Sequence, residues 1–146
     1  MEDLLDDIIV EPKLASIGSR LGAAFIDFVI IVIIFYVFAR LWGEHFSTPE
    51  ESGYRLTGLP GFSFFLVGFA LFPLMEGVTG KTTGKRVMGI RIKRKDLTDA
   101  NVGNSIVRHL FDIIDCFCLL GIIVAASTDR RQRIGDLVAG TVVVVG

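Results

Sequence analysis

The feature that most constrains this sequence is a long apolar run near its N-terminus that contains one carboxylate. Residues 21–39 read LGAAFIDFVIIVIIFYVFA, and Asp27 is the one charged residue among them. A helix of this length rises about 28 Å, which is close to the thickness of a bilayer's hydrocarbon core. An ionised carboxylate at the bilayer centre costs about 2.5–3.5 kcal/mol. We therefore expect Asp27 to face polar partners or water instead of lipid.

The composition predicts an all-α integral membrane protein. Of its 146 residues, 51% are hydrophobic and twelve are Phe, and these residues are gathered into long runs. This is too apolar for a soluble domain of the same length. Cys116 and Cys118 are separated by one residue within an apolar run, so we expect structural thiols instead of a disulfide. We expect no cofactor and no metal site.

Two membrane spans are predicted, over residues 17–41 and 59–76. The second keeps its apolar character despite Pro73, which membrane helices tolerate. A third hydrophobic segment, residues 106–126, differs because its first half is charged. It carries Arg108, His109, Asp112 and Asp115.

The distribution of lysine and arginine predicts the orientation in the membrane. The segment 77–105 holds seven basic residues, whereas residues 42–58 hold only Arg55 beside three glutamates. By the positive-inside rule, the basic loop and the N-terminus are cytoplasmic in a multi-pass protein of the plasma (inner) membrane. We expect the basic side chains to meet lipid headgroups or a partner protein. They are Lys81, Lys85, Arg86, Arg91, Lys93, Arg94 and Lys95.

The C-terminal part predicts a small two-stranded β pairing. Residues 87–93 alternate apolar and polar side chains, and residues 141–145 (TVVVV) are a β-branched run too short to span a membrane. Between them, residues 129–139 predict a short helix that stops at Gly140. Pairing of the two strands requires both on the cytoplasmic side. We therefore favour a bent or re-entrant third segment that breaks within residues 116–121, with a full third span as the alternative.

The ionisable residues form one candidate site. Arg20 and Asp27 lie seven residues apart, on nearly the same helical face. Arg108, Asp112 and Asp115 form a stripe on one face of the third segment, which we expect to face Arg20 and Asp27. Three interpretations remain open: salt bridges that hold the helices together, a site that exchanges H⁺ against a monovalent cation, or a site for another ligand.

Two further segments predict contacts. Gly18 and Gly22 form a small-xxx-small pair, which permits close approach of a helix, either within the chain or from a second copy in a homo-oligomer. The acidic segment of residues 1–13 precedes the membrane domain of residues 14–146. Its apolar residues share one helical face, which predicts docking on a basic surface.

Nucleotide binding and enzymatic activity are not expected. Residues 76–89 (EGVTGKTTGKRVMG) are rich in glycine and lysine, but the first glycine of the phosphate-binding pattern is replaced by Met75. A basic segment beside a membrane span favours anionic lipid over nucleic acid as a partner. No arrangement typical of nucleophilic or two-carboxylate catalysis is evident, so we expect no enzyme.

Four motifs in order make the sequence similar to the RDD family of small membrane proteins. They are SRLGAAFIDF, GVTGKTTGKRVMGIRI, IVRHLFDIID and RRQRIGDLVAGTVVVV. The family is named for an arginine and two aspartates. By this resemblance Arg20 is the arginine, Asp27 the first aspartate, and Asp136 or Asp115 the second. Arg108-His109 stands where the family usually has Arg-Asn, and the stretch that follows is shorter than usual.

The resemblance implies a membrane protein for which transport, including Na⁺/H⁺ antiport in some members, has been proposed. Two functions are therefore expected. The first is a small-solute or cation/proton transporter that uses buried charges, with Asp27 as the group that binds the proton or cation. The second is a membrane scaffold or accessory subunit that docks a cytoplasmic partner.

Overall fold

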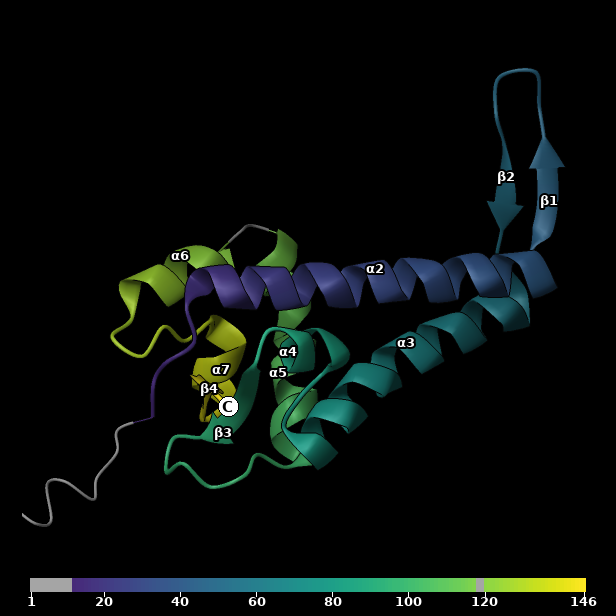
Figure 1. Cartoon of the computed structure of the whole chain (residues 1–146). Helices are drawn as coiled ribbons and strands as arrows, with labels where there is room; N and C mark the ends of the chain where they lie inside the picture. The colour runs from purple at the N-terminus through teal and green to yellow at the C-terminus, as the bar shows by residue number, and fades with distance from the viewer. Residues whose placement is uncertain (1–11, 118–119) are drawn as a thin grey trace, which may run out of the picture.

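The computed structural model describes residues 12–117 and 120–146, with side chains described for residues 12–112 and 123–146. The described chain is mostly helical and carries two small antiparallel sheets. Two long helices, α2 and α3, diverge from a shared end that bears a β-hairpin. The remaining elements gather around the opposite end of the pair (Figure 1).

Both predicted spans are present as long helices. Helix α2 runs over Ile17–Trp42 and α3 over Gly58–Thr79. Their most apolar 18-residue windows have mean hydropathies of 2.7 and 1.8, and only 6% and 11% of these windows are buried within the chain. Ser16 begins α2 by accepting a hydrogen bond from the Ser19 N–H at 3.0 Å. Length and composition thus suit both helices for crossing a membrane, and their apolar surface faces outward.

A β-hairpin between the long helices was not predicted. Strand β1 (Glu44–Ser47) pairs antiparallel with β2 (Ser52–Arg55). The Arg40 guanidinium at the end of α2 donates a 2.5 Å hydrogen bond to the Tyr54 hydroxyl and lies over its ring. This contact fixes the hairpin to the end of α2.

The expected C-terminal strand pairing is confirmed. Strand β3 (Ile90–Arg94) pairs antiparallel with β4 (Thr141–Val145), with Ile92 opposite Val143. The backbone of Leu14 bridges to β4 from the other side, through Val144. Strand β4 therefore lies between β3 and the segment that leads into α2, which explains why four successive residues, Thr141 and three valines, are buried there.

The boundaries of two predicted elements were wrong. The strand expected from residue 87 begins at Ile90, because residues 83–87 form a short helix, α4 (Thr83–Val87), capped by Thr82. The helix expected over residues 129–139 is the shorter α7 (Ile134–Ala139). Its predicted stop is correct, since Gly140 adopts a φ of 66°, a left-handed conformation that glycine takes without strain.

The third hydrophobic segment folds as two helices near the start of α2. They are α5 (Val102–Phe117) and α6 (Leu120–Ser127). Helix α5 runs across the direction of α2 instead of beside it (Figure 1). The break predicted within residues 116–121 includes residues 118–119, which lie outside the described residues. The predicted docking of the segment 1–13 likewise falls mostly on residues outside them.

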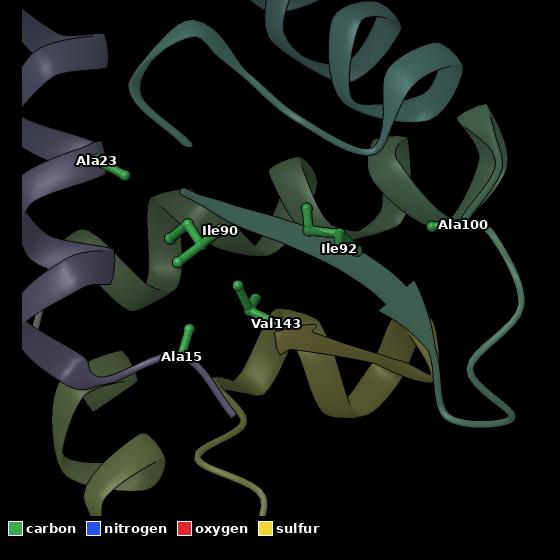
Figure 2. Packing of buried hydrophobic residues seen from close by; sticks show 6 residues of the cluster. All are labelled: Ala15, Ala23, Ile90, Ile92, Ala100 and Val143. Atoms are coloured by element: carbon green, nitrogen blue, oxygen red, sulfur yellow. The ribbon is translucent and has the colours of Figure 1, made fainter. Parts of the chain in front are cut away.

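A small apolar core packs the elements that gather around the start of α2. Its buried apolar cluster joins Ala15 and Ala23 to Ile90, Ile92 and Val143, with Ala100 at one side (Figure 2). Close approaches of backbone complete the packing. A Cβ on Gly77 would overlap the backbone of Val102, so this glycine lets α3 cross α5 tightly.

Candidate functional site

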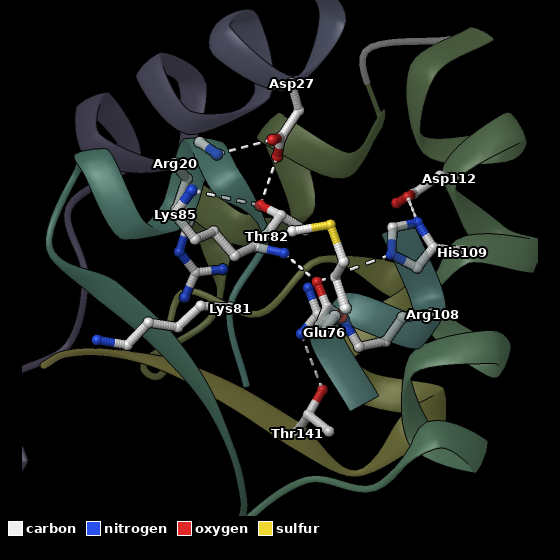
Figure 3. Close-up of polar contacts among 12 residues, drawn as sticks. Arg20, Asp27, Glu76, Lys81, Thr82, Lys85, Arg108, His109, Asp112 and Thr141 are labelled. Carbon is white, nitrogen blue, oxygen red and sulfur yellow. Dashed lines mark hydrogen bonds and ion pairs between the residues drawn. The ribbon is translucent and has the colours of Figure 1, made fainter. Parts of the chain in front are cut away.

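Asp27 is held by uncharged donors from α4. Its Oδ2 accepts a 2.5 Å hydrogen bond from the Thr82 hydroxyl, and its Oδ1 accepts a 2.7 Å bond from the Gly84 N–H (Figure 3). This approach requires glycine at position 84. A Cβ there would overlap the Ala23 carbonyl oxygen and lie 2.9 Å from Asp27 Cγ. Among the described residues, no basic side chain forms an ion pair with Asp27.

Asp136 is fully buried and joins three segments of the chain. Its Oδ2 lies 3.0 Å from Arg20 Nη1 and accepts a 3.1 Å hydrogen bond from the Arg133 backbone N–H. Its Oδ1 lies 2.8 Å from Arg108 Nη1. One carboxylate therefore ties the first turn of α2 to the start of α7 and to α5.

Glu76 forms a second buried ionic centre at the end of α3. Its side chain has no exposed surface and forms ion pairs with Arg108, whose Nε lies 3.0 Å from Oε1, and with Lys85. His109 Nε2 lies 3.7 Å from Oε2 (Figure 3). Arg108 is thus shared by Glu76 and Asp136, and it also donates to the Thr141 hydroxyl at 3.2 Å.

Asp112 lies at the edge of this network. Its Oδ2 is 2.7 Å from His109 Nδ1, and its Oδ1 is 3.1 Å from Arg133 Nη2. The side chain is 34% exposed, so solvent reaches this pair more readily than the two buried centres. The side chain of Asp115, the last member of the predicted stripe, lies outside the described residues.

Burial and charge act in opposite directions on Asp136. Burial alone would raise the pKa of Asp136, but the cations Arg108, Arg133 and Arg20 outweigh it and hold the pKa below its ordinary value. For Lys85 burial dominates. It lowers the pKa of the Lys85 ammonium although Glu76 acts to raise it. The ion pairs therefore favour the ionised form of Asp136 despite its burial.

A cavity of about 650 Å³ lies between α2, α3 and this network. One part is apolar and is lined by Phe28 and Ile31 of α2 and by Phe69 of α3. The other part is polar. Its charged lining is Arg20, Asp27, Lys85, Arg108, His109, Asp112 and Arg133. Among the residues that the structure describes, no group of three or more His, Cys, Asp or Glu side chains is placed to hold a metal ion.

The predicted convergence of charges is realised with a different set of partners. Arg20 and Arg108 meet at Asp136, not at Asp27. Asp27 was expected to be shielded by charged neighbours, but its bonded partners are a hydroxyl and a backbone amide. Both partners lie in the glycine-rich segment of residues 76–89. Nothing in the pattern of that segment indicates that it donates hydrogen bonds to α2.

Glu76 was missed as a site residue. It is the last residue of the predicted second span, and an acid at the end of a long apolar run is the same signal that drew attention to Asp27. Lys85 was grouped with the surface cations, but it lies against Glu76 with a side chain that is only 13% exposed. Lys93 pairs at the surface with Asp99, which is 79% exposed. The Lys81 ammonium reaches the Gly146 carbonyl oxygen at 2.6 Å.

The remaining predicted basic residues lie in α4, in β3 and directly after β3. Arg86, Arg94 and Lys95 are exposed, and Arg91 is half-buried.

The two glycines of the predicted small-xxx-small pair, Gly18 and Gly22, differ in their surroundings. The Met88 side chain covers Gly22, where a Cβ would lie 3.0 Å from Met88 Cε, whereas Gly18 is exposed. Gly22 therefore serves packing within the chain.

The fold and site define a small, mostly helical protein with two membrane-length helices and a buried ionic network at one end of them. A family model described as the RDD family matches residues 14–140, and the chain belongs to this family. Searches among curated proteins and among solved structures returned no match. The family is associated with membranes, and its match includes Arg20, Asp27 and Asp136.

Proposed function

We propose that the chain is a multi-pass protein of the plasma membrane in which α2 and α3 span the bilayer. The support is the outward-facing apolar surface of both helices, which an aqueous environment would leave unburied. Basic side chains concentrate at the end formed by α4 and β3, so this end is cytoplasmic. The β1–β2 hairpin then lies outside. Strand β4 pairs with β3, and the C-terminus accordingly lies on the cytoplasmic side.

Within this arrangement we propose transport of a monovalent cation or small solute coupled to protons. The observation that carries this proposal is the contrast between Asp27 and the other buried acids. Glu76 and Asp136 are each paired with arginine, whereas Asp27 lines the cavity and, among the described residues, accepts bonds only from uncharged donors. A carboxylate without a compensating cation is the one best suited to exchange a proton for a cation. Two spans enclose no complete pathway, so the proposal includes a homo-oligomer, for which the exposed Gly18 offers a contact.

A scaffold is the second candidate. The observation in its favour is that the buried acids Glu76 and Asp136 are each paired with basic side chains. Arg20, Arg108 and Asp136 join segments far apart in sequence, as a purely structural network would. The exposed basic residues would then dock a partner or anionic lipid.

Transport in everted membrane vesicles separates these candidates. The lumen of the vesicles is first acidified. Na⁺ or K⁺ is then added to the outer medium, and a fluorescent dye reports the change in ΔpH. For a cation/proton exchanger we expect dequenching with the wild-type chain and loss of the response with Asp27→Asn. Lys93→Ala is the matched control, because it removes a charge from a surface pair that lies outside the cavity.

A further variant tests whether Asp27 acts through its carboxylate or only through its contact with α4. Thr82→Val removes the hydroxyl donor but keeps the carboxylate, so exchange persists with a shifted pH dependence. A response of the inserted wild-type protein equal to that of vesicles without it contradicts transport and favours the scaffold.

A further inference from the structure

The cavity has two chemically different parts. Toward the middle of α2 and α3 its lining is hydrocarbon, from Phe28, Ile31, Gly68 and Phe69. These helices expose apolar side chains on their outer surfaces as well, so this part adjoins the region we assign to the bilayer interior. Toward the start of α2 the lining changes to charged groups within one continuous space. Such a shape suits a ligand that has both an apolar and a polar part.

The polar part presents mainly hydrogen-bond donors. The basic side chains in its lining are Arg20, Lys85, Arg108, His109 and Arg133. Their buried partners Glu76 and Asp136 have no exposed surface and do not line the cavity. The acids that do line it are engaged, Asp27 by the α4 donors and Asp112 by His109 and Arg133. A ligand in the polar part would therefore contact the basic side chains, while the carboxylates Glu76 and Asp136 that pair with them stay buried behind the lining.

Arg20 carries donors that are not used within the described residues. Its Nη1 pairs with Asp136, but Nε and Nη2 are buried and have no hydrogen-bond partner. Two adjacent guanidinium N–H groups match the spacing of two oxygens on a phosphate. Burying such donors without an acceptor is costly, so an acceptor supplied by a ligand would be favourable.

We propose that this cavity binds one anionic phospholipid. Its phosphate accepts hydrogen bonds from the free donors of Arg20 at the polar part. One acyl chain lies against α2 and α3 at the apolar part. Inorganic phosphate would satisfy Arg20 but leave the apolar part without an occupant, so we assign the ligand to the lipid leaflet. This proposal goes beyond the proposed function, because it rests on Arg20 and the apolar lining of the cavity and requires no proton exchange at Asp27.

Native mass spectrometry of the purified full-length protein tests the proposal. The protein in detergent is offered phosphatidylglycerol or phosphatidylcholine, and the lipid that remains bound after detergent exchange is counted. The wild type should retain one phosphatidylglycerol about tenfold more strongly than phosphatidylcholine. Both lipids carry the phosphate, but the quaternary ammonium of phosphatidylcholine would lie beside the basic lining of the polar part. Arg20→Gln should weaken retention of phosphatidylglycerol, because its phosphate loses the donors of Arg20. Gly68→Leu, which fills the apolar part and leaves every charge in place, should weaken retention of both lipids.

Arg86→Gln is the matched control, because Arg86 is an exposed cation on α4 that does not line the cavity. It should behave as the wild type. Equal retention of the two lipids by the wild type overturns the proposal, and so does equal loss in Arg20→Gln and Arg86→Gln. Displacement of phosphatidylglycerol by excess inorganic phosphate assigns the site to a free anion and overturns the lipid. The wild-type comparison alone decides the matter if a variant does not fold.

Discussion

The Arg20 guanidinium and the Asp136 carboxylate meet at 3.0 Å although 116 positions separate them in the sequence. The contact joins the first turn of α2 to α7, and Arg108 closes it from the opposite carboxylate oxygen at 2.8 Å. Because Asp136 has no exposed surface, each arginine compensates a charge that water does not reach. The start of the first long helix is thereby fixed to the C-terminal part of the chain.

Removal of the Asp136 carboxylate should destabilise the fold strongly. Asp136→Ala leaves Arg20 and Arg108 without a shared anion, and loss of one member of a buried pair costs about 3–5 kcal/mol. After heating in detergent, we expect the monodisperse fraction of Asp136→Ala to fall at a markedly lower temperature than that of the wild type. Asp99→Ala is the control, since this exposed carboxylate pairs with Lys93 at the surface. Equal melting of the two variants contradicts the buried ionic centre.

A methyl group at position 84 should be more damaging than one at position 18. In Gly84→Ala the Cβ overlaps the Ala23 carbonyl oxygen, so α4 must move away from α2 and the Gly84 bond to Asp27 is lost. In Gly18→Ala the nearest atom is Ser16 Oγ at 3.8 Å, and alanine favours the helix. We expect poor yield of folded Gly84→Ala and normal yield of Gly18→Ala, measured by size-exclusion chromatography. Normal yields of both variants contradict the close α2–α4 contact.

The pairing of β3 with β4 predicts that both lie on one side of the membrane. Single cysteines at Ser47, Lys95 and Val145 report on the hairpin, the basic segment and the C-terminal strand, in a background where Cys116 and Cys118 are replaced by alanine. In intact cells a membrane-impermeant maleimide should label Ser47→Cys only. Lys95→Cys and Val145→Cys should react after permeabilisation. Labelling of Val145→Cys but not Lys95→Cys in intact cells contradicts the proposed topology.

The sequence predicted the long helices well because their signal is local. An apolar run of about 20 residues needs no partner to be recognised, and α2 and α3 end within three residues of the expected limits. The pairing of β3 with β4 was also accessible, since a β-branched run too short to span required a strand partner. By contrast, the partners in the buried ion pairs could not be predicted from the sequence. Arg20 was expected to find its partner on the third segment, but the choice of Asp136 depends on how α7 packs.

The partners of Asp27 could not be predicted from the sequence either. They are a hydroxyl and a backbone N–H, and a sequence gives no sign of which backbone groups a fold leaves available. The β1–β2 hairpin was missed for a related reason. Its strands are four residues each and carry no β-branched residues, so the pattern there is too short to stand out from a polar loop.

Acid should destabilise the wild type through Asp136 in particular. The pKa of Asp136 is lowered by folding from its ordinary value of 3.8, so the unfolded chain takes up the proton first as pH falls. Its contribution is therefore fully present above the ordinary value and is lost as pH falls through the folded-state pKa. Melting temperatures in detergent should decline as the pH is lowered from about 5 to about 3. Asp136→Asn, which is less stable at neutral pH, should decline less steeply, and parallel curves would contradict the assignment.

The second buried centre predicts that two harmful substitutions partly compensate each other. Glu76→Gln leaves the Lys85 ammonium and the Arg108 guanidinium facing a neutral amide, and Lys85→Met alone removes one of the cations that balance Glu76. In the double variant Glu76→Gln/Lys85→Met, one anion and one cation disappear together, so the local charge returns to balance around Arg108.

We expect the double variant to unfold at a higher temperature than Glu76→Gln alone, with a coupling free energy of about 1–3 kcal/mol from the four melting curves. The control cycle combines Glu76→Gln with Lys93→Met, whose ammonium pairs with Asp99 instead. It should be additive. Additivity in the Lys85 cycle as well would mean that Lys85 does not balance Glu76, because a buried ion pair couples its two members through the charge they neutralise.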